Sequence, residues 1–310
     1  MSEKPKNVGA SVRERLLHLS RKTGTDFGVT LTNYAFERLL YRLSCSPHRE
    51  RFVLKGAMLF RIWSGDPHRA TRDMDLMAFG NPAADDIAGL FREMCTLDLE
   101  DDGVIFQEGR IRTEEIRETQ EYDGVRVKLI AQIAGARIPL QIDVGFGDAV
   151  VPPAEEMLYP TLLGFPAPQI KTYTRETVIA EKFQSMVSLG IANSRLKDFY
   201  DIYWLASSYG FSGQSVGSAI RATFERRSTS IPSVPPIALT EEFSGDPAKV
   251  NQWRAFITGR GVKTVSADLD EVVVLLRQFL LPPSQYLVTG EPFGKNWFPP
   301  GPWTPEWQNP

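Results

Sequence analysis

Two stretches of sequence decide how this chain folds. They are Thr71-Arg72-Asp73-Met74-Asp75-Leu76 and, much later, Gln141-Ile142-Asp143-Val144. Side chains alternate between the two faces of a strand, so a strand over the first run places Met74 and Leu76 in a core and both aspartates on the opposite face. The same alternation in the second run buries its isoleucine and valine and leaves its glutamine and aspartate on the other face. The pattern predicts two half-buried strands that carry three carboxylates.

Three carboxylates on neighbouring strands repel one another unless a cation lies between them. Hard oxygen ligands suit Mg²⁺, which keeps several waters and shares phosphate oxygens with a substrate. Asp73, Asp75 and Asp143 are therefore candidate metal ligands and catalytic residues, in an arrangement typical of two-metal phosphoryl or nucleotidyl transfer. An Asp-x-Asp pair alone is more often a solvated turn, so the prediction depends on the strand alternation around it.

The segment from Arg51 to Trp63 reads as a short strand that turns into a helix at Gly56. Glycine lets the backbone approach a ligand closely, and the free N–H groups of a helix start favour a phosphate. This turn would place Lys55, Gly56 and Ala57 against the phosphates of a nucleotide. The alternative is that Gly56 is only a packing glycine, which the segment taken by itself favours.

Further nucleotide contacts are expected just before the first two carboxylates. Thr71 lies two residues before Asp73 on the same strand parity, so its hydroxyl should face the phosphate site. Arg72 or Lys182 would hold triphosphate oxygens through charge-assisted hydrogen bonds.

Two helices predicted in the second half of the chain carry a further charged cluster. In the helix from residue 174 to 190, Lys182 lies beside an apolar stripe and needs an anionic partner or a path to solvent. The next helix begins near Arg195, and its Asp198 and Asp201 are neighbours on one face, where like charges call for a cation. One interpretation is that these groups act in catalysis, with Lys182 on a triphosphate. The other is a structural ion-pair network joining two helices.

Strand-like segments dominate from residue 52 to 148, and the pattern becomes helical from 174 to 281, which indicates an α+β lobe followed by a helical lobe. Gly135 predicts a hairpin turn between the last two long strands. We expect an N-terminal α+β lobe over residues 1-165, a helical lobe over 166-283 and a Pro/Trp-rich tail over 284-310. The prolines from residue 282 onward are expected to exclude a helix, while the tryptophans need a surface on which to pack.

Composition narrows the possible partners. The 310 residues carry a net charge of −3, so an RNA would have to be held by a local patch. The two cysteines form no ligand cluster, which argues against structural zinc. The first residues lead to no apolar segment, and Val272 to Leu281 is too short to span a bilayer, so we expect a cytoplasmic protein without a membrane partner. The candidate RNA contacts are Arg221, Arg226, Arg227, Arg254, Arg260 and Lys263.

The order of these motifs resembles the AbiEii/AbiGii family of toxin nucleotidyltransferases, which includes the MenT toxins. The resemblance covers roughly residues 30 to 280 and rests on Lys55-Gly56-Ala57, Arg69 to Leu76, Gln141 to Asp143, Ala180-Glu181-Lys182 and Arg195 to Asp201. It implies a polymerase-β-like nucleotidyltransferase lobe with a helical C-terminal lobe, Mg²⁺ and a nucleoside triphosphate. It also implies a toxin that adds nucleotides to tRNA acceptor ends and is paired with a cognate antitoxin.

Gly56-Ala57 replaces the Gly-Ser or Gly-Gly pair that is usual in the wider superfamily, so a hydroxyl contact at the second position is missing. Two alternatives remain open: transfer to a small-molecule or protein hydroxyl, and a catalytically silent nucleotide-binding scaffold. The intact carboxylate trio favours the enzyme.

Overall fold

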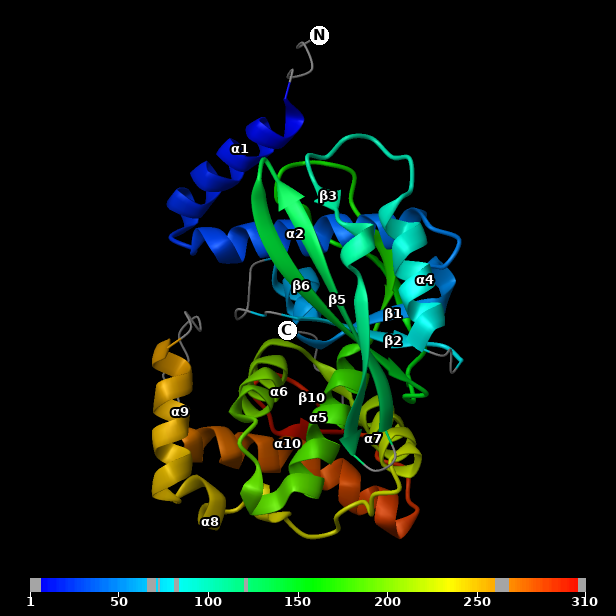
Figure 1. Ribbon diagram of the computed structural model, residues 1–310. Coiled ribbons are helices and arrows are strands. Elements are labelled where there is room, and N and C mark those ends of the chain that lie inside the picture. The colour runs from blue at the N-terminus through cyan, green and yellow to red at the C-terminus, as the bar shows by residue number, and fades with distance from the viewer. Residues whose placement is uncertain are drawn as a thin grey trace. The chain divides into compact units, whose positions relative to one another are not determined.

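A computed structural model describes residues 7–65, 71, 73–80, 84–119, 122–259 and 268–305. The chain divides into two compact units, which Figure 1 shows in a ribbon coloured along the sequence. The first unit contains residues 1–147 and 155–172, and the second contains 148–154 and 173–310.

The first unit is built on an eight-stranded mixed sheet of order β3-β5-β6-β2-β1-β8-β7, with β4 also paired to β5. Strands β2 and β6 are parallel, whereas β1 with β2 and β5 with β6 are antiparallel. The α+β class expected from the sequence is confirmed. The strands are β1 Phe52–Lys55, β2 Asp73–Ala78, β3 Ile105–Phe106, β4 Arg112–Thr119, β5 Tyr122–Ile133, β6 Ala136–Phe146, β7 Glu155–Leu158 and β8 Gln169–Thr172.

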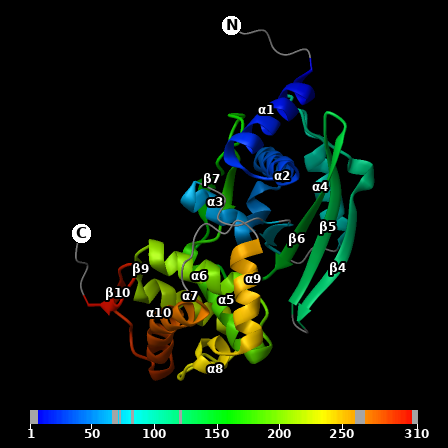
Figure 2. The ribbon, with the colours of Figure 1, turned by 90° about the vertical axis from the view of Figure 1, so that its left-hand side faces the viewer.

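Helices cover one face of this sheet. Helices α2 and α4 contact each other and pack on the same sheet face, as the view in Figure 2 also shows. That face receives the predicted apolar parity, since Met74, Leu76, Ile142 and Val144 are all at most 1% exposed. The opposite parity is therefore left open in this unit. Its helices are α1 Val8–Thr23, α2 Phe27–Cys45, α3 Leu59–Ser64 and α4 Ala84–Cys95, with short 3₁₀ turns η1 Arg49–Arg51, η2 Gly56–Met58 and η3 Glu108–Arg110.

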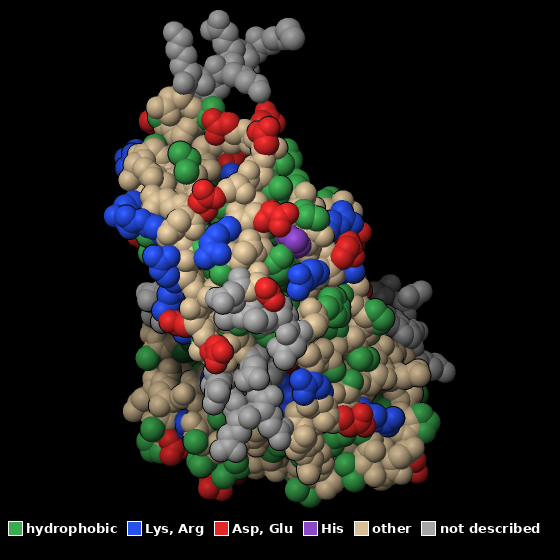
Figure 3. Space-filling view, turned by 45° about the vertical axis from the view of Figure 1, so that its right-hand side comes forward, with side chains coloured by type: hydrophobic (Ala, Val, Ile, Leu, Met, Phe, Trp, Pro, Cys, Tyr) green, Lys and Arg blue, Asp and Glu red, His purple; other side chains and the backbone are tan. Residues whose placement is uncertain are grey.

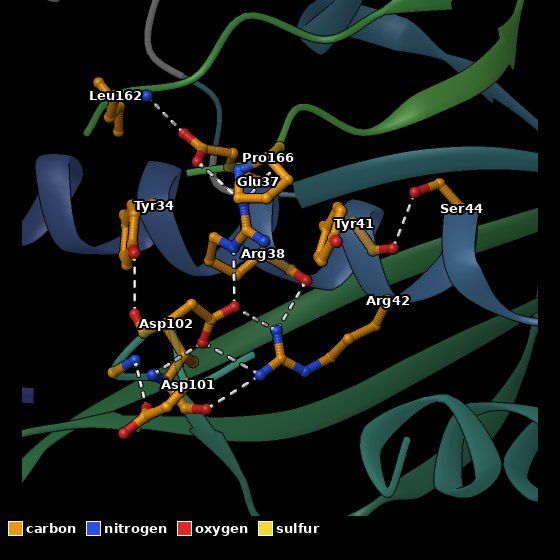
Figure 4. Close-up of polar contacts among 12 residues, drawn as sticks. Tyr34, Glu37, Arg38, Tyr41, Arg42, Ser44, Asp101, Asp102, Leu162 and Pro166 are labelled. Atoms are coloured by element: carbon orange, nitrogen blue, oxygen red, sulfur yellow. Dashed lines mark hydrogen bonds and ion pairs between the residues drawn. The ribbon is translucent and has the colours of Figure 1, made fainter. Parts of the chain in front are cut away.

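A buried ion-pair network fastens α2 to the loop that precedes β3 (Figure 4). Arg38 donates from Nε to Asp102 at 2.8 Å, and Arg42 donates to the same carboxylate at 2.7 and 3.1 Å. Burial by itself raises the pKa of Asp102, but hydrogen bonds and charge from Arg42 and Arg38 hold it below its usual value. The network is part of the scaffold of the first unit.

The second unit is mainly helical. It contains α5 Arg175–Leu189, α6 Leu196–Ser208, α7 Gly213–Arg226, α8 Glu241–Ser244, α9 Pro247–Gly259 and α10 Leu269–Thr289, with 3₁₀ turns η4 Gly190–Ala192 and η5 Ile237–Leu239. A small antiparallel sheet of order β11-β10-β9 joins β9 Phe211–Ser212 to β10 Asn296–Trp297 and β11 Trp303–Thr304. In the described part of the chain, no helix is both long and apolar enough to cross a membrane.

The expectation that prolines exclude a helix from residue 282 onward is wrong, because α10 continues through Pro282 and Pro283 to Thr289. A proline cannot donate to the carbonyl four residues earlier, which for Pro283 is that of Phe279. The indole N–H of Trp303 donates to that carbonyl at 3.0 Å and so replaces the missing bond. The tail packs on the second unit in the same way through Trp297, which is fully buried and donates to the carbonyl of Ala206 at 2.7 Å.

Candidate active site

Strands β2 and β6 bring the three sequence-predicted carboxylates together. Their parallel register places Asp75 beside Asp143 and Asp73 beside Gln141, all on the open face of the sheet. Oxygen atoms of Asp73, Asp75 and Asp143 lie within 4.8 Å of one another, and all three side chains are half-buried. An all-carboxylate donor set at this spacing suits a hard divalent cation such as Mg²⁺. The residues therefore fit the metal that the sequence predicted.

A cation stands on each side of the adjacent carboxylates. Lys55 on β1 is paired in register with Asp75, and Arg126 on β5 is paired with Asp143. Arg126 donates from its Nε and a terminal nitrogen to the two oxygens of Asp143, both at 2.8 Å. Hydrogen bonding to this carboxylate raises the pKa of Arg126. The pair fixes the orientation of Asp143, a role that the sequence analysis did not assign to any residue.

The glycine turn is fitted to the carboxylate of Asp75. The predicted change from strand to helix at Gly56 is confirmed: β1 ends at Lys55, and η2 leads directly into α3. Gly56 has φ +75°, and a Cβ at this position would lie 1.9 Å from Oδ2 of Asp75. Only glycine leaves room for that oxygen. Lys55 and Gly56 therefore both adjoin Asp75, and Ala57 is the next residue of the turn, in η2.

Thr71 stands next to Asp73 in a defined contact. Its hydroxyl donates to Oδ1 of Asp73 at 2.7 Å and lies 3.0 Å from the carbonyl oxygen of the same residue. The hydroxyl therefore orients one of the candidate metal ligands. Arg72, the other residue expected to contact phosphate here, lies outside the described residues.

The second unit assembles the predicted cluster of Lys182, Asp198 and Asp201. Nζ of Lys182 on α5 lies 2.6 Å from Oδ1 of Asp198 and 2.9 Å from Oδ2 of Asp201, both on α6. The two aspartates are at most 1% exposed. Nε of Arg195 lies 3.1 Å from Oδ2 of Asp198. Two buried carboxylates thus face two cations, an ion-pair network that joins the two helices.

At least one arginine of the expected RNA patch in the second unit is already engaged by carboxylates of the protein. Arg227 lies 3.2 Å from the carboxylate of Asp148 and 3.3 Å from that of Glu181, and it also donates to the side chain of Gln184 at 3.0 Å. Those contacts make it a structural residue of the second unit. Arg260 and Lys263 lie outside the described residues.

The family model "Nucleotidyl transferase AbiEii toxin, Type IV TA system" matches residues 38–273, which include all three carboxylates and the Lys182 cluster. Among solved structures, JHP933 from Helicobacter pylori aligns with 15% identity and a TM-score of 0.46, over 83% of this chain and 94% of that one. A second H. pylori protein, described as a candidate nucleotidyltransferase, aligns with 15% identity and a TM-score of 0.44, over 81% of this chain and 93% of that one. Among curated proteins, none matches this chain.

Proposed function

Because the chain belongs to the AbiEii family of nucleotidyl transferase toxins of type IV toxin–antitoxin systems, we propose that it transfers nucleotides from a nucleoside triphosphate to RNA, at the 3′ acceptor end of tRNA. Loss of a free acceptor end would block aminoacylation and hence translation. The observation that carries the proposal is the cluster of Asp73, Asp75 and Asp143 within 4.8 Å. The toxin would act in the cytoplasm and be neutralised by a cognate antitoxin.

In the first unit, some residues would bind the metal and others would orient those ligands. Asp73, Asp75 and Asp143 would hold Mg²⁺, which when bound supplies positive charge to the triphosphate and to the attacking oxygen. Thr71 keeps Asp73 oriented, and Arg126 keeps Asp143 oriented, before any substrate arrives. Such preorganisation lowers the reorganisation needed at the moment of reaction.

The triphosphate would lie on the β1 side of the carboxylates. Gly56 allows the backbone to come within contact of Asp75, so a phosphate shared with Asp75 would also meet the turn formed by Lys55, Gly56 and Ala57. Arg72 is a further candidate for a charge-assisted bond to the phosphates.

We assign Lys182, Asp198 and Asp201 to the same function. The ion pairs hold the Lys182 ammonium at a fixed position within the second unit, where its side chain is 12% exposed. The two aspartates would then act by positioning this ammonium, not by binding metal themselves.

The deciding experiment is incubation of the purified protein with total RNA, Mg²⁺ and each labelled nucleoside triphosphate in turn. Label should enter tRNA-sized RNA, with wild-type protein but not with Asp73→Asn or Asp143→Asn. Expression of the wild-type chain in a bacterium should arrest growth, whereas cells that express the Asp73→Asn variant should continue to grow. Label in a small molecule or protein instead of RNA would replace the proposed acceptor. The absence of transfer to every acceptor would indicate a silent nucleotide-binding scaffold.

A further inference from the structure

A pocket of about 360 Å³ opens on the same sheet face as the carboxylates, within the first unit. Its lining includes Arg110 from η3, Lys128 and Ile130 from β5, and Pro139 and Gln141 from β6. None of the residues already placed in the metal cluster or the glycine turn belongs to it. The pocket adjoins the carboxylate cluster but is lined by other residues.

The strand register makes this pocket continuous with the carboxylate cluster. Gln141 is the direct neighbour of Asp73 on β2 and of Lys128 on β5, so the three side chains form one line across the sheet. The side-chain amide of Gln141 also lies 3.4 Å from an oxygen of Asp143. The next line on this face pairs Ile130 with Pro139. Because Gln141 and Lys128 lie on the same line as Asp73, the pocket begins directly beside the metal cluster, and Ile130 and Pro139 lie about 6.6 Å further along the strands.

The carboxylates separate the pocket from the glycine turn. The sheet order β1-β2-β6-β5 puts Gly56 at the β1 end of this series and the pocket at the β6–β5 end. A nucleotidyl transfer needs the triphosphate on one side of the reacting phosphorus and the attacking hydroxyl on the other, roughly in line. If the triphosphate lies by Gly56, the acceptor must come from the side of the pocket.

The chemistry of the lining fits a nucleotide of a single strand. Ile130 and Pro139 give an apolar floor on which a base can stack, and the exposed Arg110 and Lys128 give cations for phosphate. Lys128 already forms an ion pair with Glu114, whose carboxylate lies 2.8 Å from its Nζ. Among the described residues, Arg110 forms no ion pair, so its charge is the more available one.

Local cations matter here because the chain as a whole is not basic. The net charge is −3, and Figure 3 shows acidic and basic side chains interspersed over one face. Binding of an RNA must then come from small sites where a few cations meet a few phosphates. A volume near 360 Å³ is enough for one nucleotide and too small for a duplex.

We propose that this pocket binds the single-stranded 3′ end of the RNA acceptor, and this inference rests on the proposed function. The base of the nucleotide preceding the attacking 3′-hydroxyl stacks on Ile130 and Pro139, and its phosphates contact Arg110 and Lys128. The terminal ribose then lies beside Gln141, between the pocket and the carboxylate cluster.

Steady-state kinetics of Arg110→Glu test the assignment. The KM for tRNA should rise about tenfold, while the KM for the triphosphate stays unchanged, since one phosphate contact is replaced by a repulsion. The matched control is Arg92→Glu, which makes the same charge change at an exposed residue on α4, on the covered side of the sheet. An equal rise in KM for both variants would overturn the pocket in favour of a general charge effect. A rise in the KM for the triphosphate alone would assign the pocket to the nucleotide instead.

Binding without turnover separates this inference from the proposed function. The affinity for labelled tRNA is measured in the absence of triphosphate over a range of salt concentrations. In Arg110→Ala the slope of log affinity against log salt should become shallower by about 0.7, the value for one single-strand phosphate contact. A short single-stranded RNA should compete with tRNA on the wild type and compete less well on this variant. Unchanged slopes and unchanged competition would refute the pocket even where wild-type transfer to tRNA is normal, and wild-type protein that transfers to no RNA would refute the proposed function.

Discussion

Replacement of Gly56 by alanine tests whether the glycine turn is fitted to the carboxylate cluster. Gly56 has φ +75°, and an added Cβ would lie 1.9 Å from Oδ2, 2.7 Å from Cγ and 2.9 Å from Cβ of Asp75. No real contact is that short, so the Asp75 side chain must leave its position. Both the stability of the first unit and its affinity for a metal should therefore fall.

The loss of stability has two sources. An alanine held at positive φ costs about 1–2 kcal/mol, because its Cβ crowds the backbone carbonyl. Rotation of Asp75 away from its preferred conformation adds about 0.5–1.5 kcal/mol. The free energy of unfolding should thus fall by about 1.5–3.5 kcal/mol. Nucleotidyl transfer should fall close to background because one carboxylate no longer faces the other two.

Gly65→Ala is the matched control. Gly65 also has φ +75°, but no atom lies within 4 Å of its added Cβ, so this variant carries the backbone strain alone. Urea unfolding, binding of Mn²⁺ as a reporter of the metal site, and nucleotide transfer should be measured for both variants. If Gly56→Ala binds metal and turns over as well as Gly65→Ala, the fit of the turn to Asp75 has no functional weight and the reasoning fails. In an Asp75→Ala background the additional cost of Gly56→Ala should shrink, since the two nearest atoms are gone.

Four further outcomes are expected. Asp73→Asn should abolish transfer while leaving the urea midpoint equal or higher, because it removes a charge from a repelling cluster; a lower midpoint would contradict this. Arg126→Gln should reduce turnover, because Asp143 loses the group that orients it, but should not weaken Mn²⁺ binding, because the removed group is itself a cation. A parallel loss of turnover and of Mn²⁺ binding would refute a positioning role. Lys182→Met should lower the free energy of unfolding by about 3–5 kcal/mol because it leaves buried carboxylates without their shared cation; unchanged urea unfolding would exclude that network as a stabilising element. Burial raises the pKa of Glu37 to about 7 from 4.5, so the folded state holds the proton more tightly and wild-type stability should decline as pH rises from 4.5 to 7; Glu37→Gln should lack this decline in thermal unfolding, and an identical slope for both proteins would contradict the assignment.

The local part of the site was predictable because strand parity is local. Met74 and Leu76 follow from alternation, and with them the common face of Asp73 and Asp75. The position of Arg126 was within reach as well. The hairpin turns at Ala134 and Gly135, both with positive φ, and counting outward from this turn pairs Arg126 with Asp143. Gly135 predicts the turn, and the pairing of Arg126 with Asp143 follows once the register is counted along both strands from it.

Other features depend on contacts between distant segments. Nothing local specifies that β6 lies beside β2, or that the register aligns Asp75 with Asp143 and not with Ile142. A shift by one residue would turn every side chain of β6 to the other face, so burial of Ile142 and Val144 selects between those alternatives only after the strands have paired. The helix through Pro283 was missed for a similar reason, because its support comes from Trp303, twenty residues further along the chain.

The line of charges across β1, β2, β6 and β5 explains how the sheet tolerates the carboxylates. Two like charges directly opposite each other on neighbouring strands destabilise the pairing, yet here Asp75 and Asp143 have Lys55 and Arg126 as their outer neighbours. A carboxylate has about four lone-pair sites, so the two hydrogen bonds from Arg126 leave acceptor capacity on Asp143 for a metal. Arg126 therefore need not leave when a metal binds. It follows that the flanking cations preserve the geometry of the cluster before a metal binds. The negative charge that remains for a metal to neutralise lies between β2 and β6, where Asp73 adds a third carboxylate.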